Sequence, residues 1–169
     1  GRYDVIHPND HVNASQSTND AYPTAVKLAT YAGIQTLLEA LAALRGAFEA
    51  KAEEFASILK IGRTQLQDAV PMTLGQEFAA FAAMVADDEK RLRESAYLMT
   101  EVNMGGTAIG TGINAPVGYV DVVVPTLATL SGVPVKAARN LIAATADTGA
   151  FVDISAVHKR IAPKLSKIS

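Results

Sequence analysis

The stretch Ile34–Phe55, with the sequence IQTLLEALAALRGAFEAKAEEF, decides the fold class of this chain. Apolar residues recur in it at steps of three and four, which places them on one face of an α-helix. These residues are Ile34, Leu37, Leu41, Leu44, Phe48, Ala52 and Phe55, with Leu38 and Ala42 beside them. Because such a stripe is typical of the contact seam of a helical bundle, the stretch predicts one long helix that packs against others.

Further helical patterns flank this seam. Asn19 or Asp20 as a cap, with Pro23 in the first turn, predicts a helix start near residue 20, and the helical period continues to about Leu59. More helices are expected over residues 72–104, 116–130 and 137–146 and from residue 149 onward, with Asn114 as a candidate cap. The fold class is therefore all-α, and a bundle of long helices is the expected architecture.

Composition narrows the class of protein. The chain has 169 residues, of which 49% are hydrophobic, and this excludes a disordered chain. Fifteen Lys and Arg residues against seventeen Asp and Glu residues give a net charge of −2, which indicates neither nucleic acid nor a membrane surface as a partner. The chain has no cysteine and no uninterrupted apolar run of about 20 residues. We expect a soluble, cytoplasmic protein.

Both ends of the chain look interrupted. The first residues carry no initiator methionine, and a helical stripe near the other end runs on without a cap or a glycine stop. This stripe consists of Val157, Ile161, Leu165 and Ile168. We therefore expect this chain to be a piece of a longer protein.

Two further segments have plain structural interpretations. Residues 87–94 are strongly charged but form i,i+4 pairs, Asp87 with Arg91 and Glu89 with Arg93, which predicts a solvated helix face rather than a catalytic carboxylate pair. Gly105–Asn114 contains four glycines, yet it matches neither the Walker spacing nor a full G-x-G-x-x-G, and no strand is expected before it. We expect these glycines to allow tight turns or close backbone packing.

Three polar clusters are candidates for chemistry: His7–Asn13, Ser15–Asp20 and Lys60–Gln76. The last combines cationic, hydroxyl, amide and carboxylate groups in a proline-containing loop between helices, which suits a small, charged, polar ligand. Ser15–Asp20 precedes a helix, so its residues either cap that helix or bind a carboxylate at its positive end. Both interpretations stay open on residue chemistry alone.

The histidines of the first cluster have metal-ligand spacing but an unsuitable context. His7 and His11 are separated by four positions, which on a helix presents two ligands. Pro8, Asn9 and Asp10 lie between them and favour a turn, and no third ligand is evident. We therefore expect no metal site.

The length of the first helix separates the polar clusters. A helix over residues 24–59 is about 50 Å long at about 1.5 Å per residue. Ser17–Asn19 lie at one end of it and Thr64 at the other. If both clusters bind one small molecule, the site must combine different subunits of an oligomer.

Four motifs follow one another along the chain: HPNDHVN at residues 7–13, SQSTND at 15–20, GRTQLQDAVP at 62–71 and GTAIGTGIN at 106–114. Together they resemble the aspartase/fumarase superfamily, and the resemblance covers essentially the whole chain. The resemblance implies homotetramers whose long helices form a common bundle, with each active site drawn from three subunits. It also implies a lyase that needs no organic cofactor, while dependence on a divalent cation stays open.

The resemblance also assigns roles to residues. Ser17 and Thr18 would hold the substrate β-carboxylate, Asn19 would contact the leaving group, and Thr64 would hold the α-carboxylate. Donors aimed at the developing charge stabilise an aci-carboxylate intermediate. A candidate second anion site consists of His7, Asn9 and Asp10, although Asp4 stands where a basic residue is common in the family.

Position 65 separates two branches of the superfamily. Class II fumarases typically carry His there, whereas Gln65 resembles many aspartases. An amide both donates and accepts without titrating near neutral pH, which favours L-aspartate over malate. The expected function is that of an aspartate ammonia-lyase, which converts L-aspartate to fumarate and ammonia. The alternatives are a class II fumarase and a non-catalytic helical assembly module.

Elements of the family pattern are missing from this chain. The loop that supplies the catalytic serine base is absent, so no catalytic residue is assigned here, and the chain alone is expected to be inactive. Residues 1–19 would form the end of an N-terminal domain and an active-site segment, and residues 20–169 the first part of the central helical domain.

Overall fold

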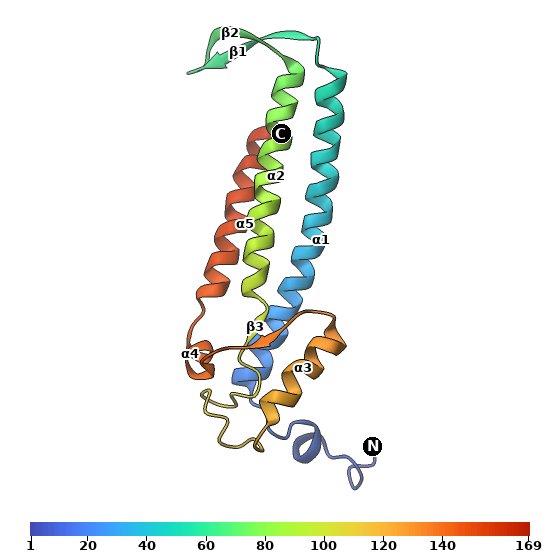
Figure 1. Cartoon of the computed structure of the whole chain (residues 1–169), viewed down its shortest axis with the longest axis vertical. Helices are drawn as coiled ribbons and strands as arrows, with labels where there is room; N and C mark the ends of the chain where they lie inside the picture. The colour runs from blue at the N-terminus through green and yellow to red at the C-terminus, as the bar shows by residue number, and fades with distance from the viewer. The chain divides into compact units, whose positions relative to one another are not determined.

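A computed structural model describes all 169 residues, which divide into two compact units. Unit 1 consists of Gly1–Gly33 and Ser95–Ile154, and unit 2 of Ile34–Glu94 and Ser155–Ser169. Three long helices contribute to both units: α1 (Thr18–Glu54), α2 (Leu74–Leu98) and α5 (Gly149–Ile168) (Figure 1). The all-α class is confirmed, and none of the helices combines the length and apolar character that a membrane span requires.

Unit 2 is built on the predicted seam. Its parts of α1, α2 and α5 run side by side, with α2 between the other two (Figure 1). The residues buried along these helices include Ile34, Leu38, Leu41, Ala82, Val85, Leu92 and Ile161. Towards the end of α1, Phe48 packs against Phe81 with ring centroids 5.7 Å apart, and Phe55 against Phe78 at 5.4 Å. The seam read from Ile34–Phe55 is therefore the observed core.

The loop expected between the first two helices is a β-hairpin. Strands β1 (Leu59–Thr64) and β2 (Gln67–Thr73) pair antiparallel, with Leu59 opposite Thr73 and Thr64 opposite Gln67. The predicted helix boundaries at Leu59 and Met72 were therefore wrong. Helix α2 begins at Leu74 because Thr73 and Gln76 form a reciprocal capping box, in which each side chain accepts the backbone N–H of the other at 3.0–3.1 Å.

The charged middle of α2 is only partly solvated, which corrects the sequence prediction. The pair Glu89–Arg93 is present at 2.9 Å, but the Glu89 side chain is 4% exposed because Arg45 of α1 also donates to it at 2.8 Å. Burial alone would raise the pKa of Glu89, yet the hydrogen bonds and charges of Arg45 and Arg93 outweigh burial and lower this pKa below its usual value.

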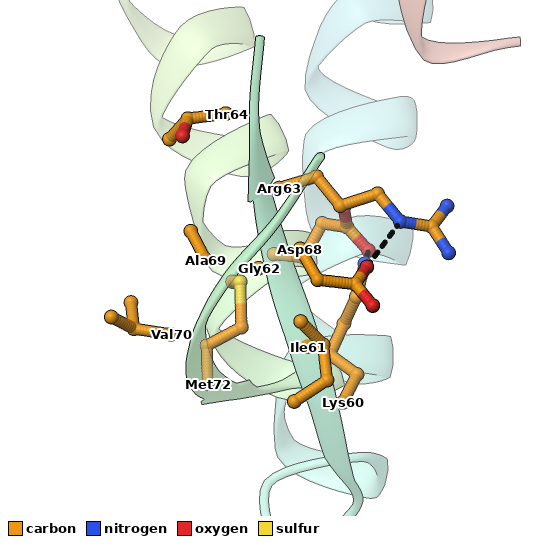
Figure 2. Close-up of a pocket in the computed structure, with 10 residues that line it drawn as sticks. Lys60, Ile61, Gly62, Arg63, Thr64, Asp68, Ala69, Val70 and Met72 are labelled. Atoms are coloured by element: carbon orange, nitrogen blue, oxygen red, sulfur yellow. Dashed lines mark hydrogen bonds and ion pairs between the residues drawn. The ribbon is translucent and has the colours of Figure 1, made fainter. Parts of the chain in front are cut away.

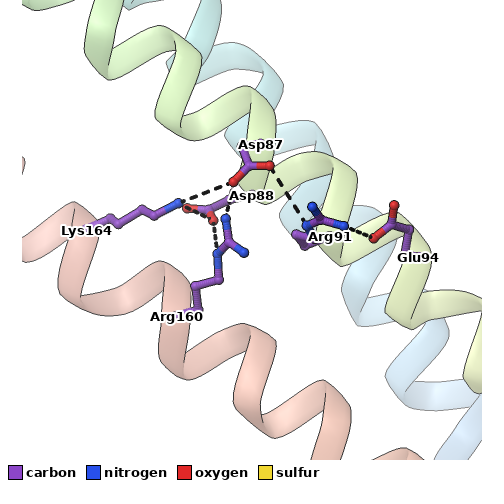
Figure 3. Close-up of polar contacts among 6 residues, drawn as sticks. All are labelled: Asp87, Asp88, Arg91, Glu94, Arg160 and Lys164. Carbon is purple, nitrogen blue, oxygen red and sulfur yellow. Dashed lines mark hydrogen bonds and ion pairs between the residues drawn. The ribbon is translucent and has the colours of Figure 1, made fainter.

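Asp88 makes a second buried ion pair, between α2 and α5. Its side chain is 3% exposed and accepts from Arg160 Nε at 3.0 Å and Lys164 Nζ at 2.6 Å (Figure 3). Its neighbour Asp87 is 46% exposed and contacts Arg91 at 3.9 Å and Arg160. The i,i+4 interpretation was right for Asp87 but missed that Asp88 faces another helix.

Unit 1 surrounds a small apolar core with short elements. They are α3 (Tyr119–Ser131), α4 (Leu141–Ala146) and a parallel pair of two-residue strands, β3 (Glu101–Val102) and β4 (Lys136–Ala137). The core consists of Val102, Met104, Val124, Val133 and Val135. The predicted second helix ends early, at Leu98 rather than Met104, because residues 101–102 form β3.

The helix starts in unit 1 differ from those predicted. Asn114 caps no helix, because α3 begins at Tyr119 after Gly118, which has a left-handed backbone. Helix α4 begins at Leu141, where the Asn140 side chain accepts the N–H groups of Ile142 and Ala143, both at 3.0 Å. The start of the last helix at Gly149 is confirmed.

Candidate functional site

The polar segment before α1 forms a capping box. Ser17 Oγ accepts the N–H of Asn19 at 3.1 Å, and Asp20 Oδ1 accepts the N–H of Ser17 at 2.8 Å. The cap is thus Ser17, not Asn19 or Asp20 as the sequence suggested. Ser17 and Thr18 also line an open hollow of about 500 Å³, together with Asn13, Gln16, Ala21 and Tyr22. Capping therefore leaves these hydroxyl-bearing residues beside a concave surface at the positive end of a long helix.

Asn19 is held from two sides by the segment that follows α2. The side-chain Nδ2 of Asn19 donates to the backbone carbonyl of Ala108 at 2.7 Å, and the backbone carbonyl of Asn19 accepts from Asn103 Nδ2 at 2.9 Å. Asn103 also contacts Thr145 Oγ1 at 3.0 Å and is 3% exposed. The glycine-containing segment 105–114 therefore forms turns that support Ser17–Asn19, in line with the structural interpretation of its glycines.

The second group of predicted residues lies on the hairpin of unit 2. Thr64 ends β1, and a two-residue turn of Gln65 and Leu66 leads to β2. Both turn residues have left-handed backbones, with φ of +50° and +63°, although neither is glycine. Such turns favour Asn-Gly or Gly-Gly, so this tip carries backbone strain of the kind found at functional sites.

The hairpin also has a concave face of about 610 Å³, lined by Lys60–Thr64, Asp68–Val70, Met72 and Glu77. Arg63 and Asp68 pair across the strands at 3.3 Å, as Figure 2 shows, and Lys60 pairs with Glu77 at 2.5 Å. Each cation therefore has a carboxylate partner, Asp68 in the hairpin for Arg63 and Glu77 in the first turn of α2 for Lys60. The Thr64 hydroxyl remains on this face as an uncharged hydrogen-bonding group (Figure 2).

The first polar cluster is a single helical turn, whereas its Pro-Asn-Asp sequence favoured a turn over a helix. Residues Pro8–Val12 form a short π-helix, and His7 Nδ1 accepts the N–H groups of Asn9 and Asp10 at 3.3 and 3.2 Å. His11 Nδ1 accepts the N–H of His7 at 2.8 Å, so both imidazoles stabilise the turn through this nitrogen. His7, Asn9 and Asp10 thus lie together, as a candidate anion site requires.

Asp4, the residue that departs from the family pattern, is itself paired. Arg2 donates to its carboxylate at 2.6–3.1 Å, and these hydrogen bonds lower the pKa of Asp4 below its usual value. Arg2 thereby offsets the negative charge that Asp4 places near the turn. A basic residue is therefore present upstream of His7, although two positions before Asp4.

The structure thus groups the predicted residues into local sites. Ser17, Thr18 and Asn19 belong to unit 1, as does the turn that contains His7, whereas Thr64 and Gln65 belong to unit 2. Sequence reasoning missed the residues that support Ser17–Asn19, chiefly Asp20 as a long-range partner and Asn103. Their partners are more than 80 positions away, and no local pattern marks such contacts.

Long helices that carry hydroxyl and amide groups near their ends are the main feature of this chain. A family described as "Lyase" matches residues 2–169. The chain belongs to this family, within the aspartase/fumarase superfamily.

Individual relatives agree with this assignment. The chain is 60% identical to an aspartate ammonia-lyase of Pseudomonas aeruginosa and 52% identical to one of Escherichia coli. Both matches cover 99% of this chain, and they cover 36% of the Pseudomonas protein and 35% of the Escherichia protein. A solved fumarate lyase of Brucella melitensis superposes with a TM-score of 0.96 at 58% identity, over 99% of this chain and 36% of that one. For a class II fumarase of Schistosoma mansoni the TM-score is 0.86 at 32% identity, over 96% and 37%. The chain spans about a third of the length of the curated relatives it matches.

Proposed function

We propose that the whole protein is an aspartate ammonia-lyase, which eliminates ammonia from L-aspartate to give fumarate. The observation that carries the proposal is the identity of 52–60% to proteins named aspartate ammonia-lyase, against 32% to a class II fumarase. Gln65 at the hairpin tip supports the same choice. Its amide offers a donor and an acceptor to an ammonium-bearing substrate without titrating near neutral pH.

In this proposal the two local sites hold opposite ends of the substrate. Ser17 and Thr18 bind the β-carboxylate at the positive end of α1, and Asn19 contacts the leaving amino group. Thr64 binds the α-carboxylate, with Gln65 beside the ammonium group. Hydroxyl and amide donors stabilise the negative charge that builds on the β-carboxylate when a base removes the proton from Cβ. The base itself is not assigned to a residue of this chain.

We further propose that each active site is shared between subunits of a homotetramer. Helix α1 has 37 residues, which corresponds to about 55 Å at 1.5 Å per residue. Ser17 directly precedes this helix, and Thr64 follows it. A four-carbon substrate is far shorter than the helix, so antiparallel association of copies would supply the two ends of one site.

We also propose a second anion site, a division into domains, a cellular location and a reaction without an organic cofactor. His7, Asn9 and Asp10 would bind a second anion, supported by their common turn and by Arg2 nearby. Residues 1–19 would close an N-terminal domain, and residues 20–169 would begin the central helical domain. A cytoplasmic location and a reaction without an organic cofactor complete the proposal.

The test is turnover by the full-length protein, followed through the ultraviolet absorbance of fumarate. We expect fumarate from L-aspartate and not from L-malate. Fumarate from malate alone would assign the protein to the class II fumarases. Turnover of neither substrate would favour a helical assembly module.

A further inference from the structure

Asp20 is a fully buried carboxylate with an unusual set of partners. It is 0% exposed, and its two oxygens accept three backbone N–H groups. Oδ1 accepts from Ser17 at 2.8 Å, and Oδ2 accepts from Gly105 at 3.1 Å and Thr107 at 2.9 Å. Burying a charge is costly unless such hydrogen bonds compensate for the lost water. Ordinary helix capping requires only the first of these bonds, so the other two call for a separate explanation.

The segment that Asp20 holds is strained and closely packed. Gly105 and Thr107 have φ of +91° and +58°, and the left-handed region is unfavourable for a β-branched residue such as Thr107. A Cβ atom at Gly105 would lie 2.6 Å from Val120 Cγ2, so the backbone approaches α3 as closely as glycine permits. Strain of this kind persists only where surrounding contacts impose it. The Asp20 carboxylate, bound to the N–H groups of Gly105 and of the strained Thr107, is such a contact.

The same carboxylate also holds the start of α1. Through Ser17 N–H it sets the backbone that carries the Ser17 hydroxyl, two residues before Asn19. Asn19 in turn is attached to Ala108 and Asn103. Residues 17–19 are therefore fastened to residues 103–108 at both ends, and Asp20 is the one side chain that bonds both segments through its two oxygens.

We propose that Asp20 is a positioning residue for substrate binding by Ser17–Asn19. By joining this segment to Gly105 and Thr107, it holds the hydroxyl and amide groups in place before substrate arrives, which removes an ordering cost from binding. The role rests on the proposed function, in which Ser17–Asn19 bind the β-carboxylate. Asp20 itself does not touch the substrate.

The experiment compares Asp20→Asn with Asp88→Asn in the full-length protein. Asparagine keeps the shape of aspartate but replaces one accepting oxygen by an NH₂ group, which opposes the N–H donors around Asp20. Asp88 is a matched control because it is also buried, at 3% exposure, but lies in unit 2 outside the proposed site. Both variants should lower Tm. Only Asp20→Asn should lower kcat/KM for aspartate, by about 100-fold, as expected when binding groups shift by about 1 Å.

Inhibition by succinate measures binding alone, because this dicarboxylate has both carboxylates of the substrate but no leaving group and cannot react. Its inhibition constant therefore separates a loss of positioned binding groups from a general loss of stability. We expect its inhibition constant to rise with the KM for aspartate in Asp20→Asn and to stay unchanged in Asp88→Asn. If Asp20→Asn lowers Tm but leaves both constants unchanged, the positioning role is wrong. Should this variant fail to fold, Asp20→Ser keeps one accepting oxygen but cannot bond Ser17 and residues 105–107 through two oxygens, and an unchanged inhibition constant there would equally contradict the proposal.

Hydrogen exchange distinguishes failure of this inference from failure of the proposed function. In the full-length protein the amides of Ser17, Gly105 and Thr107 should be protected, and Asp20→Asn should remove protection from at least one of them. Absence of aspartate turnover in the unmodified protein would overturn the proposed function. Hydrogen exchange would still test whether Asp20 joins Ser17 to Gly105 and Thr107. Unchanged protection of all three amides in Asp20→Asn would overturn the inference even in an active enzyme.

Discussion

Replacing Asp88 by alanine should lower the free energy of unfolding by about 2 kcal/mol. The change removes hydrogen bonds from Arg160 at 3.0 Å and Lys164 at 2.6 Å. Breaking a fully buried ion pair from one side costs about 3–5 kcal/mol. The side chains of Arg160 and Lys164 are 39% and 27% exposed, so water can solvate the cations left behind and reduce this cost.

The neighbouring Asp87→Ala is the matched control. Its side chain is 46% exposed, so we expect a loss of about 0.5 kcal/mol or less. Urea unfolding of both variants measures the difference, and the slope m should not change. A double-mutant cycle between Asp88→Ala and Lys164→Ala isolates their coupling. Equal losses for Asp88→Ala and Asp87→Ala would refute the claim that burial makes Asp88 the stronger partner.

Three further changes test the packing, the buried charge and the substrate choice. Gly75→Ala should destabilise the chain by about 1–3 kcal/mol, because the new Cβ would lie 2.4 Å from the Ala52 carbonyl oxygen. Gly46→Ala is the control, since open space surrounds Gly46, and it should stabilise α1 by about 0.5–1 kcal/mol. Thermal unfolding measures both variants, and equal shifts in Tm would contradict the close approach of Gly75 to Ala52. Because the pKa of Glu89 is lowered, its ion pairs contribute stability above the ordinary pKa of 4.5 and lose it as pH falls below that value. Unfolding measured between pH 3 and pH 7 should therefore depend less on pH in Glu89→Gln, and an unchanged slope would contradict the pairing. Gln65→His should shift preference in the full-length protein from aspartate towards malate, measured as the ratio of kcat/KM values, and an unchanged ratio would remove Gln65 from the substrate choice.

The long helices were predictable because their apolar residues repeat with the helical period. Ile34 and Leu41 are buried as that period requires. The hairpin was missed because its turn residues, Gln65 and Leu66, lack the Asn-Gly signature of a two-residue turn. The start of α2 was readable in principle, since Thr73 stands three positions before Gln76, which is the spacing of a capping box.

The long-range polar contacts were not predictable from local spacing. Glu89 matched the i,i+4 rule with Arg93, but its burial follows from Arg45 on another helix. Asp20 was interpretable as a cap, whereas its bonds to Gly105 and Thr107 join segments 85 and 87 positions apart. Such contacts depend on how the chain folds back on itself, which the period of a single helix does not contain.

Subunit complementation tests the central claim, a site shared between copies of the protein, most directly. Ser17→Ala and Thr64→Val each disable one of the two proposed local sites. If a site takes Ser17 from one subunit and Thr64 from another, random coassembly of the two variants leaves about a quarter of the sites intact. Coexpressed variants should then recover about a quarter of the aspartate turnover of the unmodified full-length protein. Activity no higher than that of the separate variants would contradict the shared site.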